Sequence, residues 1–140
     1  MKTWWSLVSL FVVVLAFSPS ARSAETPEKA ATKEAQAWLA IVDQGKAGES
    51  WDAAAKLFKG AVTREKWIEA VTAARGPLGK VVSRKLKSAK FATTLPGAPD
   101  GKYVVIQFAT SFEQKKHAVE TITPMQEPDG SWKVSGYFVK

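Results

Sequence analysis

The sequence contains no cysteine and a single histidine, and these two shortages exclude several classes of function. Without cysteine the chain can form no disulfide, no thiolate nucleophile and no cysteine metal site. A catalytic triad or a metal site built on His117 would need a second histidine or a cysteine as partner, and the chain supplies neither. No Gly-x-Ser-x-Gly elbow and no phosphate-binding glycine loop occurs. We therefore expect no metal site, no cofactor and no catalytic residues, and a domain that is stabilised by its core alone.

The first residues are typical of a secretory signal peptide. After Lys2, the segment Leu7 to Phe17 is apolar apart from Ser9, and small residues follow it. An apolar run this short cannot span a bilayer core, which needs about 20 residues. We expect cleavage near Ser23 and Ala24, export to the periplasm or the medium, and no stable membrane anchor afterwards. The predicted organisation is a signal peptide over 1–23, a short polar leader over 24–29 and a single domain over 30–140.

Positive charge is in moderate excess. The chain has a formal net charge of +7, to which the predicted signal contributes Lys2 and Arg22, and no long run of like charges occurs. An exported protein rarely meets nucleic acid, so we expect no nucleic-acid partner. The surplus indicates either contact with anionic envelope surfaces or solubility alone.

The spacing of apolar residues changes from a period of 3.6 to a period of two after Gly79. It predicts three helices followed by four strands. The helices lie within Glu28–Gly45, Glu49–Gly60 and Thr63–Pro77, with Thr26, Ser50 and Thr63 as N-caps. The strands lie within Lys80–Phe91, Lys102–Phe112, Lys116–Met125 and Ser131–Val139. Short links between the last strands imply antiparallel neighbours, so we expect an α+β fold.

Two further patterns favour structural interpretations. The tripeptide Pro-Asp-Gly occurs at 99–101 and at 128–130, where it predicts turns with a left-handed glycine. A calcium loop would need several alternating carboxylates, which neither copy has. The tryptophans Trp38, Trp51, Trp67 and Trp132 lie on apolar stripes, one in each predicted helix and one in the last strand. This distribution predicts one packed core.

Several segments of the mature chain resemble one family of small exported bacterial proteins. These segments are "WLAIVDQGKAGESWDAAAKLFK", "ARGPLGKVVSRKL", "LPGAPDGKYVVIQFATSF", "KKHAVETI" and "DGSWKVSGYFVK". The family they resemble is catalogued as domain of unknown function 4019, so the resemblance implies no activity. It implies an exported domain with three N-terminal helices packed on a curved four-stranded antiparallel sheet, similar to a cystatin-like or nuclear-transport-factor-2-like cone.

One charged residue interrupts an otherwise apolar face in each of two predicted strands. These positions are Arg84 between Val82 and Leu86, and Glu120 between Ala118 and Ile122. An unpaired buried charge is too costly to keep, so we expect Arg84 and Glu120 to lie close together or beside other polar partners.

Three other polar residues are candidates for the same cluster. Arg75 ends the third predicted helix, Gln107 lies on the second strand, and Tyr137 either shares the polar face or lies in water. Together with Arg84 and Glu120 they define a candidate binding pocket in the concave side of the sheet.

Three functions remain open. The first is a non-catalytic exported module that binds another envelope protein or a small ligand. The second is a small cone-type isomerase or hydrolase that uses Glu120 as an acid–base group. An arginine pair would keep that carboxylate ionised, which favours a structural role over a catalytic one. The third is a cationic binder of envelope polyanions that uses Lys85, Lys87 and Lys90.

Overall fold

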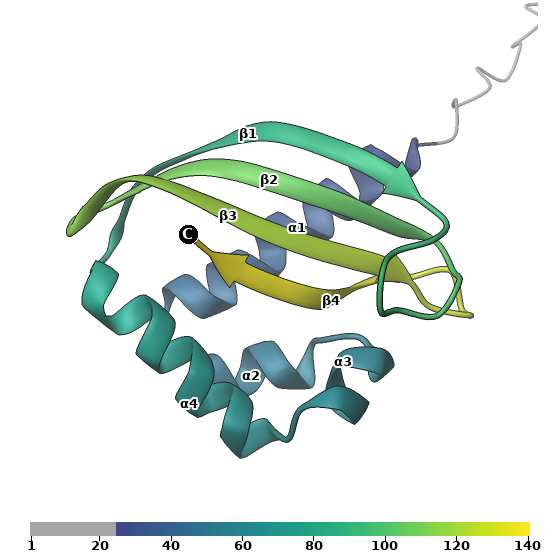
Figure 1. Cartoon of the computed structure of the whole chain (residues 1–140), viewed down its shortest axis with the longest axis horizontal. Coiled ribbons are helices and arrows are strands. Elements are labelled where there is room, and N and C mark those ends of the chain that lie inside the picture. Colours follow the sequence, from purple (N-terminus) through teal and green to yellow (C-terminus); the bar gives the residue numbers. More distant parts are fainter. Residues whose placement is uncertain (1–24) are drawn as a thin grey trace, which may run out of the picture.

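The computed structural model describes residues 25–140 of the chain (Figure 1). Four α-helices and a 3-10 helix precede four strands. Their bounds are α1 Pro27–Asp43, α2 Ala47–Asp52, α3 Lys56–Ala61, α4 Arg64–Arg75, η1 Gly76–Leu78, β1 Val81–Ala92, β2 Tyr103–Phe112, β3 Lys115–Gln126 and β4 Trp132–Val139.

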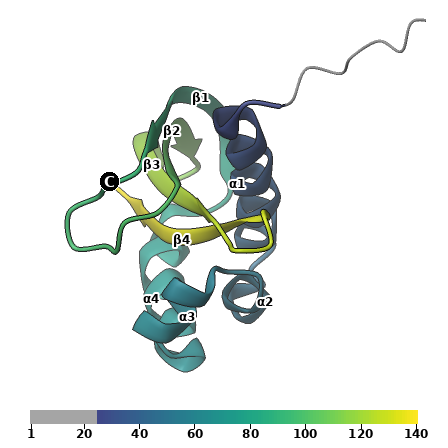
Figure 2. The ribbon, with the colours of Figure 1, turned by 90° about the vertical axis from the view of Figure 1, so that its right-hand side faces the viewer.

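The strands form one antiparallel sheet in the order β1-β2-β3-β4, so every strand pairs with its neighbour in the sequence. The sheet bends over α1, which crosses one of its faces, and α2, α3 and α4 lie together beyond β4 (Figures 1 and 2). This arrangement confirms the predicted α+β fold and the four-stranded meander.

The first helix supplies much of the core beneath the sheet. The Thr26 hydroxyl accepts a hydrogen bond from the Lys29 amide, as expected of an N-cap, and Gly45 at φ 75° follows the helix end. Its buried face consists of Ala31, Ala35, Trp38, Leu39 and Val42. The apolar period of this segment therefore predicts both its structure and the face that it buries.

The prediction of a single helix within Glu49–Gly60 is wrong. The structure has two short helices there, α2 and α3. The chain leaves helical geometry at Ala55, whose amide donates to the Val134 carbonyl at 2.8 Å. The next amide, of Lys56, donates to Glu127 Oε1 at 3.0 Å. Both partners lie far along the chain, so tertiary contacts override the high helix propensity of the alanines.

Ser50 is not the predicted N-cap but a buried residue within α2. Its hydroxyl donates to the Ala47 carbonyl at 2.6 Å and accepts from Trp67 Nε1 at 2.9 Å. Its carbonyl accepts from Trp38 Nε1 at 2.8 Å. Phe58 packs edge-on against Trp67, with ring centroids 4.9 Å apart. We call Ser50, Trp38 and Trp67 the tryptophan hub; it joins α1, α2 and α4. Trp51 and Trp132 pack against the core but are only partly buried.

Strand β1 forms one edge of the sheet and departs from the predicted burial. The residues Val82 and Leu86 are 67% and 51% exposed, whereas the sequence predicts that both turn inward with Arg84. The pairing with β2 shifts between Val81 and Ser83 and again between Leu86 and Ser88. These irregularities and the edge position leave much of β1 uncovered.

The two Pro-Asp-Gly copies differ. In the second copy the Gly130 amide donates to the Glu127 carbonyl at 2.9 Å, and Gly130 has φ 88°, which confirms the predicted turn. In the first copy Gly101 is not left-handed; Gly97 takes that conformation at φ 76°. Gly101 instead lies against the Tyr103 ring, where an added Cβ would be 3.3 Å from a ring carbon.

The predicted signal peptide lies outside the described residues. Helix α1 begins at Pro27, which precedes the expected domain start at residue 30. Between residues 25 and 140 no helix combines the length and apolar character needed to cross a bilayer.

Candidate functional site

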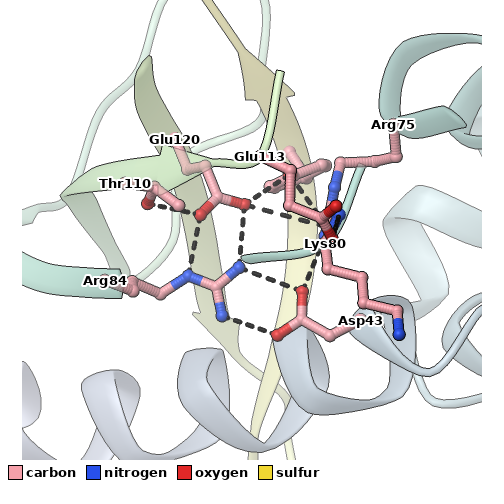
Figure 3. Close-up of polar contacts among 8 residues, drawn as sticks. Asp43, Arg75, Lys80, Arg84, Thr110, Glu113 and Glu120 are labelled. Carbon is pink, nitrogen blue, oxygen red and sulfur yellow. Dashed lines mark hydrogen bonds and ion pairs between the residues drawn. The ribbon is translucent and has the colours of Figure 1, made fainter. Parts of the chain in front are cut away.

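Arg84 and Glu120 form the predicted pair across the inner face of the sheet. Arg84 Nε donates to Glu120 Oε1 at 2.7 Å and Arg84 Nη2 donates to Oε2 at 3.2 Å, so the contact is bidentate (Figure 3). Their strands flank β2, where Thr110 lies opposite both Arg84 and Ala118. The Glu120 side chain is 0% exposed and that of Arg84 is 15% exposed. A fully buried carboxylate is thus neutralised by a nearly buried guanidinium.

Two hydroxyls complete the hydrogen bonding of Glu120. Thr110 Oγ1 donates to Oε1 at 2.6 Å and Tyr137 Oη donates to Oε2 at 2.5 Å. Burial, the negative charge of Glu120 and its hydrogen bond raise the pKa of Tyr137, so its phenol stays protonated. Each carboxylate oxygen therefore accepts from both an arginine nitrogen and a hydroxyl.

Asp43, at the end of α1, links the two arginines on the other side. It accepts from Arg84 Nη1 at 2.7 Å and Nη2 at 3.0 Å, and from Arg75 Nη2 at 2.8 Å (Figure 3). Partial burial alone would raise the pKa of Asp43, but the hydrogen bonds and positive charges of Arg84 and Arg75 outweigh it and lower that pKa. Burial likewise opposes the charged form of Arg84, yet Asp43 and Glu120 raise its pKa.

Arg75 joins the cluster from the end of α4. Its Nη1 lies 3.9 Å from Glu120 Oε2 and donates to Tyr137 Oη at 3.5 Å, and its guanidinium lies 4.9 Å from the Phe112 ring centroid. Its Nε is buried without an acceptor among residues 25–140. We define the charge network as Asp43, Arg75, Arg84, Thr110, Glu120 and Tyr137. Its two guanidinium groups balance its two carboxylates.

The structure brings four of the five predicted site residues together. Arg75, Arg84, Glu120 and Tyr137 belong to the network, whereas Gln107 does not. Gln107 neighbours the inward-facing Phe108, so strand alternation turns it to the outer face, where its amide lies 3.5 Å from the Thr121 hydroxyl.

The β3–β4 register decides whether Tyr137 shares the polar face of the sheet or lies in water, which the sequence leaves open. The β3–β4 pairing shifts between Thr123 and Pro124, and this irregularity lets both Tyr137 and Val134 face the helices. Tyr137 therefore lies on the polar face and not in water.

Two network residues were not predicted from the sequence. Asp43 occupies the last turn of α1, where the helix dipole disfavours a carboxylate. That unfavourable position was a usable signal for a cationic partner. Thr110 carries no such signal, because threonine is common in strands and only the register places it beside Glu120.

A cavity of about 500 Å³ adjoins the network, where α1, α2, α4 and the β2–β3 hairpin converge. It is lined by Val42, Asp43, Gly45, Ala47, Val71, Thr72, Arg75, Gly76, Gly79, Lys80 and Glu113. Asp43 and Arg75 thus face both the network and the cavity. Glu120 lies outside this lining.

The cavity wall also carries charges that the network does not neutralise. Figure 3 shows Lys80 and Glu113 on the side of the network where Asp43 and Arg75 lie. Glu113 Oε1 accepts from the Lys80 amide at 3.1 Å, and neither side chain forms an ion pair within the described residues. An ammonium and a carboxylate are therefore available to a ligand.

Fold and site together define an α+β domain in which a bent antiparallel sheet and its helices enclose a neutral network of charges beside a cavity. The chain belongs to the family described as protein of unknown function (DUF4019), whose model matches residues 34–137. Comparison with curated proteins gives no match. Within residues 25–140, no group of three histidine, cysteine or carboxylate residues could hold a metal ion.

Proposed function

We propose that this protein is a non-catalytic, exported binding module of the bacterial envelope, and that its ligand occupies the cavity beside the charge network. The observation that carries the proposal is the cavity itself. Its volume of about 500 Å³ falls within the range of about 300–1,000 Å³ that is usual for small-molecule sites.

The cavity wall has the mixed character that ligand sites require. Val42, Ala47 and Val71 offer apolar surface, while Lys80 and Glu113 offer charges of opposite sign. A small molecule or short peptide segment with an apolar body and a polar end matches this wall. An apolar body would gain about 25 cal/mol per Å² that it removes from water.

The charge network supports the proposal because two of its residues, Asp43 and Arg75, form a preorganised part of the cavity wall. Asp43 accepts hydrogen bonds from Arg84 and Arg75, and Arg75 also donates to Tyr137, so these two cavity-lining side chains lose little freedom when a ligand binds. Preorganised groups of this kind reduce the entropic cost of binding.

The alternative of an acid–base enzyme that uses Glu120 has little support from this geometry. A general base must come within hydrogen-bond reach of a substrate proton. Glu120 is fully buried, accepts four hydrogen bonds and lies outside the cavity lining. The bend of the sheet over α1 supports the proposed likeness to cystatin-like or nuclear-transport-factor-2-like cones, but it assigns no reaction.

The proposal is tested by filling the cavity. An amphipathic fragment library is screened by NMR against the protein without its signal peptide, and hits are expected to shift the amides of Val42, Val71 and Thr72. The substitution Thr72→Trp places an indole at an exposed lining position of α4 and is expected to abolish these shifts. The matched control is Ala73→Trp, which adds the same side chain at an exposed neighbouring position outside the lining.

Two results would contradict the proposal. One is fragment binding that survives Thr72→Trp unchanged. The other is turnover of a small substrate that is abolished by Glu120→Gln in a variant shown to remain folded, because that result favours the acid–base alternative.

A further inference from the structure

We propose that the outer face of the sheet, opposite the face that carries the charge network, holds a second, separate site. This site binds the phosphate group of an anionic ligand. The site is a groove of about 340 Å³ across β1, β2 and β3. Its lining includes Ser83 and Lys85 from β1, Ala109 and Ser111 from β2, and Lys116 and His117 from β3. We call it the outer groove.

The groove exists because the central strand carries small residues there. Ala109 pairs with Lys85 on one side and with Val119 on the other, and Ser111 pairs with Ser83. Since Thr110 points inward to Glu120, strand alternation turns Ala109 and Ser111 outward. Two small side chains between larger ones leave a hollow whose floor is β2.

The lining has charge of one sign only. Lys85 comes from β1, and Lys116 and His117 come from β3, so basic side chains flank the hollow from both sides. No carboxylate lines the groove, and among residues 25–140 neither Lys85 nor Lys116 forms an ion pair.

The acidic residues closest to the groove in the sequence, Glu113 and Glu120, are turned away from it. Glu113, in the β2–β3 hairpin, lines the cavity on the other face, and Glu120 is buried in the charge network. A bound anion would therefore meet ammonium groups without an opposing carboxylate in the lining.

The groups present match a phosphate. Lysine ammonium groups donate to phosphate oxygens as point charges, and the hydroxyls of Ser83 on β1 and Ser111 on β2 add neutral donors. Of the three lysines suggested for a cationic binder, only Lys85 lines the groove, where Lys116 and His117 accompany it. The phosphate can belong to a soluble molecule or to a lipid headgroup, and the experiment separates these sources.

The first arm is an NMR titration of the protein, without its signal peptide, with inorganic phosphate against sodium chloride at equal ionic strength. Saturable shifts of the Lys85, Ser111 and His117 amides are expected with phosphate only. The Lys85→Gln/Lys116→Gln variant is expected to weaken binding about tenfold, with about threefold from each exposed charge pair. The control Lys87→Gln removes one charge from the same strand outside the groove and is expected to leave the affinity within a factor of two.

The second arm is cosedimentation with phosphatidylglycerol vesicles against phosphatidylcholine vesicles. Binding to the former that is lost in Lys85→Gln/Lys116→Gln and kept in Lys87→Gln assigns the site to a lipid headgroup. Saturation by inorganic phosphate without cosedimentation assigns it to a soluble phosphate.

The proposal is overturned if neither arm detects binding, if chloride produces the same shifts, or if Lys87→Gln weakens binding as much as the double variant. Thr72→Trp, which fills the cavity on the other face, is expected to leave phosphate binding unchanged. The two sites can therefore succeed or fail independently.

Discussion

The charge network and the tryptophan hub both bury polar atoms inside the domain, but they use different kinds of partner to do so. Each buries polar atoms at a junction of several elements, and each pairs all but one of them, Arg75 Nε in the network, with a hydrogen-bond partner. The hub uses neutral groups, with Ser50 accepting from Trp38 and Trp67. The network uses full charges, with Arg84 placed between Glu120 and Asp43.

The difference lies in what happens when one partner is lost. A neutral donor left without an acceptor costs about 1–3 kcal/mol, whereas an uncompensated buried charge costs about 3–5 kcal/mol. The hub therefore tolerates change better than the network. It also has no charged atoms to offer a ligand, whereas the network presents Asp43 and Arg75 to the cavity.

The largest effect is expected from Arg84→Met. This substitution leaves Glu120 buried with only hydroxyl donors and the more distant Arg75, so the free energy of unfolding should fall by about 3–5 kcal/mol. Urea denaturation measures the loss. The control Lys87→Met also replaces a cationic side chain with methionine, at an exposed position of β1, and should stay within about 0.5 kcal/mol of the wild type.

A second variant determines whether the unpaired charge causes that loss. In Arg84→Met/Glu120→Leu both charges of the pair are removed, and at least half of the lost stability should return. If the double variant is as unstable as the sum of its single substitutions, packing and not charge dominates this site.

An intermediate effect is expected from Ser50→Ala in the hub. The substitution removes the acceptor of Trp67 Nε1, so unfolding free energy should fall by about 1–3 kcal/mol. A double-mutant cycle with Trp67→Phe, measured by urea denaturation, should give a coupling energy of about 1 kcal/mol. Strict additivity of the two substitutions would show that the hydrogen bond contributes nothing.

The smallest effect is expected from Tyr137→Phe, at about 1 kcal/mol at neutral pH, because Glu120 keeps its other donors. The effect should depend on pH. The folded protein raises the pKa of Tyr137 above its ordinary value of 10.0, so this stabilisation is complete below pH 10 and is lost as the pH rises toward the folded pKa.

The stability gap between wild type and Tyr137→Phe should therefore narrow above about pH 10. Urea denaturation of both proteins at neutral and at alkaline pH measures this gap. A gap that stays constant or widens with rising pH would contradict the proposed interaction.

The sequence predicts the features that depend on local periodicity. The buried face of α1, the N-caps Thr26 and Thr63 and the four-strand meander all follow from spacing and turn residues. The pairing of Arg84 with Glu120 follows from a second argument, the cost of leaving a charge buried alone. That argument succeeds although Val82 and Leu86, which suggested it, are exposed.

The features that were missed depend on distant parts of the chain. The break before α3 comes from Val134 and Glu127, which no local pattern connects to Ala55. The position of Tyr137 depends on a register shift in β4 that leaves no sequence signal. Gln107 is different, because simple alternation with Phe108 already predicts the outer face for it.

The two register shifts in β1 have a consequence for self-assembly. A long, flat edge strand with exposed apolar side chains invites another sheet to add to it and begin a fibre. Each interruption of the β1 ladder kinks that edge, and lysines at 85, 87 and 90 repel a second copy of the same strand. The register shifts that expose β1 thus disfavour the addition of a second molecule to this edge of the sheet.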